Sequence, residues 1–336
     1  MKVYELHPDE GFAGLRLVDR PAATTLGAHD VRVRIRAVSL NYRDLAIAKA
    51  PRRRPVPIVP TSDGAGEVIS VGAEVTRVKV GDRVAAAFFP TWLEGGLRPE
   101  HHGQALGGSI DGMLAEEVVL PDTGWVRIPS RWSFEQAATL PCAGVTSWNA
   151  LFEAASLKVG DRLLVQGTGG VSIFALQLAR ASGASVIATS SSAGKLARLE
   201  QMGAVATIDY RANANWGDAV REASGGTGVD VAVEVGGAGT FDQSVKALRF
   251  GGTMSLLGVL AGTQGTINTY AVLQKGLRVH GVYVGSVAMF EALVRALEAS
   301  AIEPVIDRVF PFADARVAYE YLASGAHVGK VVIRVE

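Results

Sequence analysis

Three glycines stand close together in the segment LLVQGTGGVSIFALQLA, at positions 167, 169 and 170. An apolar run precedes them and a run with helical spacing of apolar residues follows, so they occupy a turn between a strand and a helix. Glycine allows a tight turn and a close approach of the backbone to a phosphate, which the positive end of the helix then holds. The spacing Gly167-x-Gly169-x-x-Ser172 therefore predicts a dinucleotide pyrophosphate site, the alternative being an ordinary glycine-rich turn.

The next predicted strand, SVIATS, bears on the choice between NAD and NADP. NAD sites place Asp or Glu at the end of this strand, about 20 residues after the glycines, to bind the ribose 2′-hydroxyl. Here the strand ends in Ser190, followed by Ser191 and Lys195. These residues offer hydrogen-bond donors and a positive charge without a repelling acid, which favours the 2′-phosphate of NADP(H). Serine is also a preferred helix cap, and both roles can hold at once.

The chain has one cysteine, Cys142, in the stretch ATLPCAGVTSW. A single cysteine excludes an intramolecular disulfide and leaves the roles of metal ligand, nucleophile, redox sensor or inert residue. No histidine neighbours it in sequence, which disfavours an activated nucleophile.

The elements that must hold these residues are of two kinds. Up to about residue 125, alternating stretches such as VRVRIRAVSL predict strands separated by Gly, Asp and Pro turns. From about residue 134, apolar strands alternate with helices, from RLLVQG to LRVHGVYVG, which predicts a parallel sheet with right-handed crossovers. One of these helices is expected over TFDQSVKALRF, residues 240–250. The tail ends in the strand KVVIRVE, which can complete the first, β-rich domain.

Composition narrows the classes of function. Hydrophobic residues make up 48% of the 336 residues, and 33 basic residues balance 33 acidic ones. A large core is therefore expected, and binding to nucleic acid, which rewards a basic patch, is not. The N-terminal stretch MKVYELHPDEGF lacks an apolar signal region, and no apolar run reaches the ~18 residues of a membrane span. We expect a cytoplasmic protein with no membrane partner.

Motifs along the whole chain resemble the medium-chain dehydrogenase/reductase superfamily. In order they are NYRDL, SDGAGEV, VGDRV, ATLPCAGVTSWNAL, GTGGVS and GKVVI. The resemblance implies an α/β fold in which a GroES-like β-rich catalytic domain joins a Rossmann domain with a doubly wound parallel sheet. The expected boundaries are 1–126 with 297–336 for the catalytic domain and 127–296 for the NADP(H)-binding domain, with the cofactor in the cleft between them.

Zinc-dependent members of this superfamily hold a catalytic zinc on Cys, His and Cys. The resemblance puts Asn41 and Ser62 at the positions of the first two ligands and Cys142 at the third. Asn and Ser are poor zinc ligands, so no metal is expected. An improvised site of Asp63, Cys142 and a histidine at 101 or 102 is the less favoured alternative, since the two histidines lie in a polar loop expected to be solvated.

Without zinc, the chain resembles the quinone oxidoreductase (zeta-crystallin-like) branch. This implies that Asn41, Tyr42 and Asp44 line the nicotinamide and substrate, although Asn41 and Asp44 could instead cap a helix and Tyr42 could be wall packing. It also implies that Lys195 and Tyr210 hold the 2′-phosphate and adenosine, and that His327 and Lys330 lie beside the nicotinamide. The full set of expected cofactor contacts is Thr146, Gly167, Thr168, Gly169, Gly170, Val171, Ser190, Ser191, Lys195, Tyr210, Val235, Gly258, Val284, His327 and Lys330.

The chemistry that fits is hydride transfer from NADPH to a quinone or an α,β-unsaturated carbonyl. Such acceptors give stabilised anions, which Asn41, the Tyr42 hydroxyl or a backbone N–H can bind, so no Lewis acid is required. A zinc-free alcohol or carbonyl reductase and a non-catalytic NADPH-binding sensor or structural protein remain alternatives. The basic run Arg52–Arg54 is expected in an exposed loop, or else to attract an acidic or CoA-type substrate.

The apolar strand LRVHGVYVG is expected at the edge of its sheet. An exposed apolar edge is prone to pair with other chains, so we predict that this strand pairs with its counterpart in a homodimer.

Overall fold

The computed structural model describes residues 1–7, 10–49 and 57–335, and these divide into two compact units. Unit 1 comprises residues 1–145 and 285–336, and unit 2 comprises residues 146–284. The boundaries between the two units lie at other residues than the expected boundaries between the domains. The reason is that helix α3 (Phe134–Ala138) and helix α10 (Val287–Ala299) both pack on strands of unit 1. The exact domain boundaries stay a prediction.

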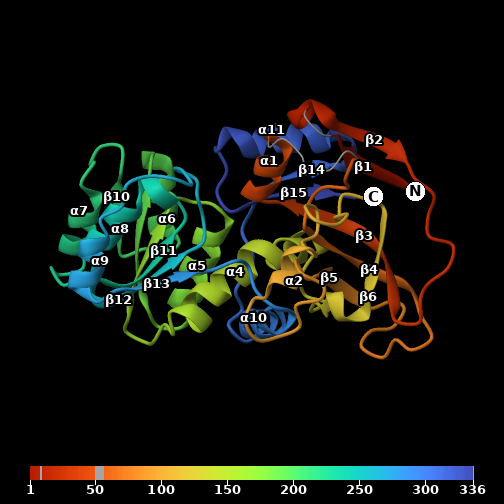
Figure 1. Cartoon of the computed structure of the whole chain (residues 1–336), viewed down its shortest axis with the longest axis horizontal. Helices are drawn as coiled ribbons and strands as arrows, with labels where there is room; N and C mark the ends of the chain where they lie inside the picture. Colours follow the sequence, from red (N-terminus) through yellow and green to blue (C-terminus); the bar gives the residue numbers. More distant parts are fainter. Residues whose placement is uncertain (8–9, 50–56, 336) are drawn as a thin grey trace. The chain divides into compact units, whose positions relative to one another are not determined.

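Unit 2 is built on a six-stranded sheet in the order β10-β9-β8-β11-β12-β13, with every neighbouring pair parallel (Figure 1). This is the order of the doubly wound nucleotide-binding fold, in which crossover helices cover both faces of the sheet. The strands are β8 (Arg162–Gln166), β9 (Ser185–Ser190), β10 (Ala206–Asp209), β11 (Val229–Glu234), β12 (Leu248–Leu256) and β13 (Arg278–Gly281). The helices are α5 (Gly170–Ala181), α6 (Ala193–Gln201), α7 (Trp216–Ala223), α8 (Phe241–Ala247) and α9 (Thr269–Lys275).

Unit 1 is built on a largely antiparallel sheet in the order β14-β15-β3-β4-β5-β7, with β6 also paired to β3 and a separate hairpin of β1 and β2. The strands are β1 (Lys2–Leu6), β2 (Leu15–Asp19), β3 (Asp30–Leu40), β4 (Asp63–Val71), β5 (Arg83–Ala86), β6 (Glu117–Pro121), β7 (Trp125–Arg127), β14 (Ile306–Pro311) and β15 (Lys330–Arg334). The other helices are α1 (Tyr42–Lys49), α2 (Pro99–His102), α4 (Val145–Trp148, at the limit of the two units) and α11 (Ala315–Ser324). The expected return of the C-terminal strand to the first domain is confirmed, since β15 pairs with β3.

The fold class is confirmed, and most elements lie where the sequence pattern predicts them. One boundary is wrong: the helix expected over 240–250 ends at Ala247, because Leu248 already pairs with Val229 as the first residue of β12. The pattern also did not separate helices α9 and α10 from their surroundings.

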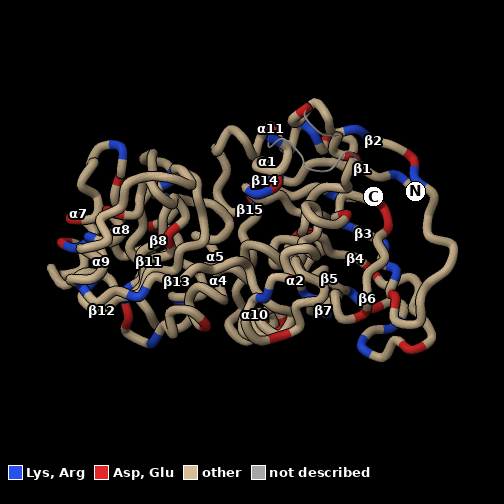
Figure 2. The backbone as a smooth tube through the Cα atoms, in the orientation of Figure 1, with Lys and Arg blue, Asp and Glu red and all other residues tan. Residues whose placement is uncertain are grey.

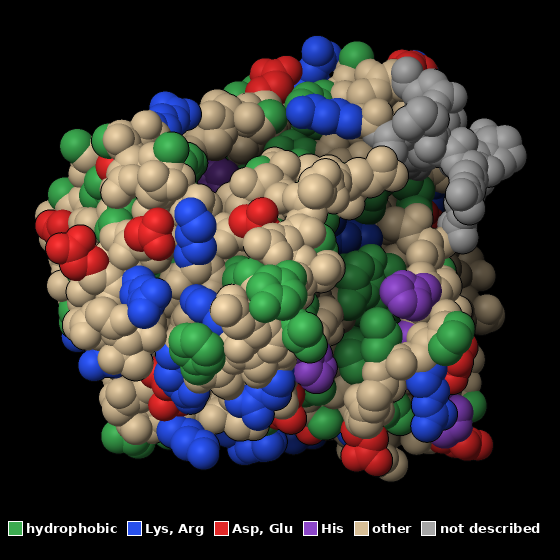
Figure 3. Space-filling view, turned by 60° about the vertical axis from the view of Figure 1, so that its left-hand side comes forward, with side chains coloured by type: hydrophobic (Ala, Val, Ile, Leu, Met, Phe, Trp, Pro, Cys, Tyr) green, Lys and Arg blue, Asp and Glu red, His purple; other side chains and the backbone are tan. Residues whose placement is uncertain are grey.

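Each unit has its own apolar core, and charge is spread over both. Acidic and basic residues are interspersed along the backbone (Figure 2), and on the face drawn in Figure 3 basic side chains lie next to acidic and hydrophobic ones. This matches the equal numbers of acidic and basic residues. Among the described residues, no helix combines the length and the apolar character that crossing a lipid bilayer requires.

Candidate functional site

The predicted cofactor residues of unit 2 follow the ends of its parallel strands. Gly167 comes directly after β8, Ser190 ends β9, Tyr210 follows β10, and Val235 follows β11. Gly258 comes soon after β12, and Val284 soon after β13. Because all six strands are parallel, these positions lie along one edge of the sheet, the edge at which doubly wound folds bind their ligands. The structure therefore brings together residues that are far apart in sequence.

The glycine turn leaves room for a ligand. Gly167 has φ +73°, a conformation that side chains disfavour, and its N–H donates to the carbonyl of Thr189 at 2.7 Å. A Cβ atom built on Gly167 or on Gly169 would meet no described atom within 4 Å. Gly169 is the N-cap of α5 and provides no side-chain cap, while Ser172 is buried and donates its hydroxyl to the Gln166 carbonyl at 2.6 Å. Open space at a helix N-terminus fits a pyrophosphate.

The residues expected around the 2′-phosphate meet at the ends of β9 and β10. Ser190 is buried, with 2% of its surface exposed, and its carbonyl accepts a hydrogen bond from the Tyr210 N–H at 3.1 Å. Ser190 is not the cap of α6: the N-cap is Ser192, whose side chain makes no cap hydrogen bond. The acid opposite Ser190 in register, Asp209, accepts from the backbone of the turn that follows it. Lys195 is half-buried in the first turn of α6.

A buried carboxylate, which no sequence motif marks, organises the loop after β11. Glu234 has no exposed surface, and its Oε1 accepts from the N–H groups of Gly236 and Gly237 at 2.7 and 3.0 Å. Its Oε2 accepts from Gln166 Nε2 at 2.8 Å. The Glu234 carbonyl also accepts from the N–H of Gly258 at 3.3 Å, so this residue ties together the two loops that carry Val235 and Gly258.

In unit 1, residues from four segments form one buried charged cluster. Lys330, at the start of β15, has 3% of its surface exposed, and its Nζ donates to the Leu40 carbonyl at 2.8 Å and to Asn41 Oδ1 at 2.5 Å. The same Nζ lies 3.6 Å from Asp63 Oδ2. Asp63 Oδ1 accepts from the Ser62 hydroxyl at 2.7 Å, and Asp63 Oδ2 from the Cys142 N–H at 3.3 Å. The name lysine cluster is used below for Lys330, Asn41, Ser62, Asp63 and Cys142.

Burial controls the protonation of the acids in this region. It raises the pKa of Asp63, against the lowering effects of the Lys330 charge, the Asn41 amide and the Ser62 hydroxyl. Burial also raises the pKa of Asp44 to about 6, although the positive charge of Arg43 and the Asn41 N–H lower it. The pKa of the Cys142 thiol is raised as well, by burial first and then by the charge of Asp63. A thiol of this kind is a poor nucleophile at neutral pH.

The three residues expected to be catalytic occupy different environments. Asp44 is buried in the first turn of α1, and its Oδ2 accepts from the Asn41 N–H at 2.8 Å, which is the geometry of a helix cap. Asp44 therefore acts in this structure as a support for Asn41. Tyr42, in contrast, has half of its surface exposed. Its catalytic role, and those of Asn41 and Asp44, stay predictions.

The side chains at the expected zinc-ligand positions fit a zinc site poorly. The carboxylate of Asp63 faces an ammonium group and two other donors, and zinc ligands must instead be free of protons and of competing cations. Within the described residues, no three His, Cys, Asp or Glu side chains are grouped so that they could hold a metal. The expectation of a solvated His101 is wrong: it is buried and stacked on Trp92, with ring centroids 5.4 Å apart.

The backbone beside the lysine cluster is strained. Thr61 has φ +67°, which is rare for a β-branched residue, and it directly precedes Ser62 and Asp63. Gly112 allows this turn, because a Cβ there would lie 1.9 Å from the Thr61 carbonyl oxygen. The strain lies in the segment that presents Asp63.

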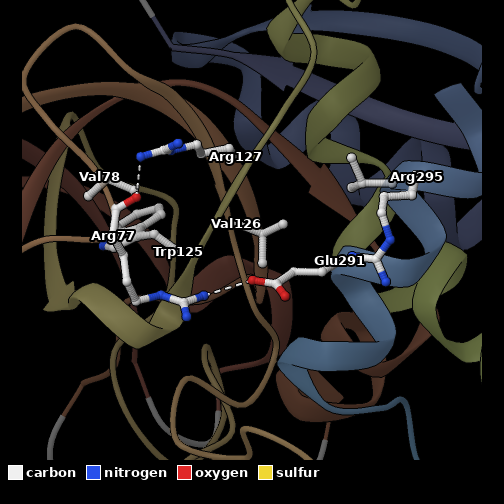
Figure 4. A pocket seen from close by; sticks show the side chains of 8 residues that line it. Arg77, Val78, Trp125, Val126, Arg127, Glu291 and Arg295 are labelled. Atoms are coloured by element: carbon white, nitrogen blue, oxygen red, sulfur yellow. Dashed lines mark hydrogen bonds and ion pairs between the residues drawn. The ribbon is translucent and has the colours of Figure 1, made fainter.

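Other expected or visible features lie outside this cluster. His327 is half-buried in unit 1, and Arg52–Arg54 lie outside the described residues. A cavity of about 340 Å³ in unit 1 is lined by three arginines and Glu291 (Figure 4). Arg77 pairs with Glu291 at 2.8 Å, and Arg127 pairs with Asp82 at 3.2 Å. The cavity shares no lining residue with the lysine cluster.

Comparison with known proteins identifies the family. Residues 27–130 match the alcohol dehydrogenase GroES-like domain, and residues 170–299 match the zinc-binding dehydrogenase family. A zinc-type alcohol dehydrogenase-like protein of Schizosaccharomyces pombe is 41% identical over 99% of both chains. The chain belongs to the medium-chain dehydrogenase/reductase superfamily.

As a medium-chain dehydrogenase/reductase, the protein is a nicotinamide-dependent oxidoreductase. A quinone oxidoreductase of Pseudomonas aeruginosa is 34% identical over 91% of both chains. The crystal structure of an NAD-dependent alcohol dehydrogenase superposes with a TM-score of 0.91 at 32% identity over all of both chains. A mycobacterial protein complexed with NADPH superposes with a TM-score of 0.84 at 27% identity over all of both chains. The names of the relatives thus include both quinone and alcohol substrates and both NAD and NADPH as cofactors.

Proposed function

We propose that the protein transfers a hydride from NADPH to a quinone or an α,β-unsaturated carbonyl without a catalytic metal. The observation that carries this proposal is the lysine cluster. The positions expected to bind zinc hold Asn41, Ser62 and the half-buried Cys142, whose thiol has a raised pKa, and the acid beside them is paired with Lys330. Oxidation of an unactivated alcohol needs help in deprotonating the hydroxyl, for which zinc is the common means. Quinones and enones need less help, because they accept a hydride to give a delocalised anion.

The glycine turn, the strand-end edge of unit 2 and the serines after β9 fit NADP(H). The glycines and the start of α5 would hold the pyrophosphate, and Ser190, Ser191 and Lys195 would hold the 2′-phosphate. When bound, the cofactor supplies the hydride. The chain's own residues orient the reactants and bind the anion as it forms: the amide of Asn41 and the hydroxyl of Tyr42 are the proposed donors, and water returns the proton.

A zinc-free reductase of aldehydes or ketones is a second candidate, favoured by the relatives that are named alcohol dehydrogenases. One assay separates the candidates: consumption of NADPH or NADH in the presence of quinones, enones and aldehydes. Turnover of a quinone or an enone with NADPH is the expected result. Turnover of aldehydes alone would support the second candidate, and binding of NADPH without any turnover would indicate a sensor or structural protein.

We also propose that the protein is a homodimer that forms through strand β13. In the described part of unit 2, β13 is the last strand of the sheet and pairs only with β12. Its Val279 is 40% exposed, and the nearby Tyr283 is 47% exposed. Pairing with a second copy would cover this edge.

A further inference from the structure

We infer that Lys330 is a positioning residue of the reaction, which orients the amide of Asn41 from a buried site rather than binding the cofactor. This inference rests on the proposed function of Asn41 as a donor to the anionic product. It assigns to Lys330 a role different from the cofactor contact that the family resemblance implies.

The first step concerns the three N–H donors of the Lys330 ammonium group and the atoms that they face. An ammonium group has three N–H donors and no acceptor. Two of them are given to the carbonyl of Leu40 and to Asn41 Oδ1, at 2.8 and 2.5 Å, and the third faces Asp63 Oδ2 at 3.6 Å. With 3% of its surface exposed and these three partners around its Nζ, Lys330 is placed to hold Asn41 rather than a ligand.

The second step is the orientation of Asn41. Because an ammonium group can only donate, the amide must turn its oxygen toward Lys330, and its Nδ2 then points away. The Nδ2 group lies close enough to the Asp63 carboxylate to lower the pKa of that acid, but it makes no hydrogen bond within normal limits to a described residue, so at least one of its two N–H donors is unfilled. A buried donor with unfilled capacity is rare in native structures and calls for a functional explanation.

The third step is polarisation. A cation bound to the oxygen of an amide draws electron density from its nitrogen, so the N–H groups become stronger donors, and a poorly solvated site enlarges the effect. Lys330 thus places a positive charge behind the donor that binds the product anion. Asp63 balances this charge and holds the ammonium in place.

The test uses the full-length protein and any acceptor that the wild type reduces. Lys330→Met should lower kcat by about tenfold or more, as expected for a weakened donor to a developing anion. The dissociation constant of NADPH, measured by fluorescence, should change less than about threefold. Because Lys330→Met alone leaves the charge of Asp63 uncompensated, it should also lower the melting temperature.

The double variant Lys330→Met/Asp63→Asn separates positioning from stability. Replacing a buried ion pair with neutral groups of similar size is often neutral for folding, so the melting temperature should return close to the wild-type value. The loss in kcat should remain. Lys275→Met is the matched control, since Lys275 also donates to backbone carbonyls but lies in unit 2, and it should leave kcat unchanged.

Three outcomes would overturn the inference. Recovery of kcat together with stability in the double variant would make Lys330 a structural residue only. A tenfold or larger rise in the NADPH dissociation constant with unchanged kcat would make it a cofactor contact. Asn41→Ala leaves the ion pair in place. If this variant has an unchanged kcat, Asn41 is not the donor on which the inference depends. That result overturns the inference even where the lysine variants do not fold. Absence of any turnover by the wild type would contradict the proposed function itself.

Discussion

Lys195 and Ser190 are the residues on which the choice of cofactor depends. Loss of one charge-assisted contact to the 2′-phosphate costs about 1.5–3 kcal/mol, which is roughly 10- to 150-fold in affinity. Lys195→Ala should therefore weaken NADPH binding by that factor and leave NADH binding nearly unchanged, because NADH lacks the phosphate. Fluorescence titration of both cofactors measures the two affinities.

Ser190→Asp provides the opposite change at the buried end of β9. An aspartate there repels the 2′-phosphate and offers an acceptor to the ribose 2′-hydroxyl, so NADPH should bind more weakly and NADH more tightly. Equal affinities of the wild type for the two cofactors, or equal losses in Lys195→Ala, would show that these residues do not select NADP(H).

Asp44 should make the stability of the protein depend on pH. Its pKa is raised by burial from 3.8 to about 6 in the folded state, so between these values the folded protein binds more protons than the unfolded chain. The contribution of Asp44 to the free energy of unfolding is therefore highest below pH 4 and falls by about 3 kcal/mol as pH rises past 6. Asp44→Asn has no titratable group at this position, so its free energy of unfolding does not fall in this way as pH rises.

The measurement is the free energy of unfolding in urea for wild type and Asp44→Asn at pH 4 and pH 7. Acids remote from Asp44 contribute equally to both proteins, so only the difference between them is interpreted, and it includes the charge coupling of Asp44 to Asp63. Asp44→Asn should gain about 2–2.5 kcal/mol relative to wild type between the two pH values, since part of the change already occurs below pH 4. A constant difference would mean that Asp44 titrates normally.

Among the structural elements, the turn before β4 requires a residue without a side chain at position 112. A Cβ atom at Gly112 would overlap the backbone oxygens of Pro60 and Thr61, at 2.6 and 1.9 Å. Gly112→Ala should therefore destabilise the protein by about 1–3 kcal/mol, the range for overpacking. Gly96→Ala, where the added atom meets nothing within 4 Å, is the control for urea unfolding. Equal stability of the two variants would contradict this role of Gly112.

The elements themselves were largely predictable from the sequence, because their signals are local. The apolar runs of β8 and β9 and the helical spacing of α5 and α7 are read within a few residues. The end of α8 was missed because apolar residues continue past Ala247, and only the pairing of Leu248 with Val229 makes the next segment a strand. Pairing between strands is not encoded in local spacing.

The candidate site was predictable only in part, for the same reason. The glycine turn and Ser190 carry short motifs, so they were found. The lysine cluster joins Lys330 to Asn41 and Asp63, which lie at the other end of the chain, and the bonds among them follow from the pairing of β15 with β3 and of β3 with β4. Glu234 was missed because the partners of its Oε2, Gln166 and Ser244, lie on other elements.

At the scale of the whole molecule, the proposed dimer depends on the open edge of β13. Val279→Lys puts a charge on this edge, which opposes pairing between strands, and should convert the dimer to a monomer. Sedimentation velocity measures the change. Val159→Lys, at an 83% exposed position of the same unit outside the sheet, should leave the dimer intact. Dimers that survive Val279→Lys would mean that another surface forms the interface.

The most direct test of the central claim combines metal content and turnover in one preparation. Zinc per chain is determined by elemental analysis of the purified protein. The protein is then treated with a chelator, and the initial rate of NADPH oxidation is measured before and after treatment with a quinone and an enone as acceptors. We expect well under one zinc per chain and a rate equal to that of untreated protein, because the lysine cluster replaces the metal ligands. Stoichiometric zinc before treatment, with activity lost on chelation and restored by added zinc, would contradict the account.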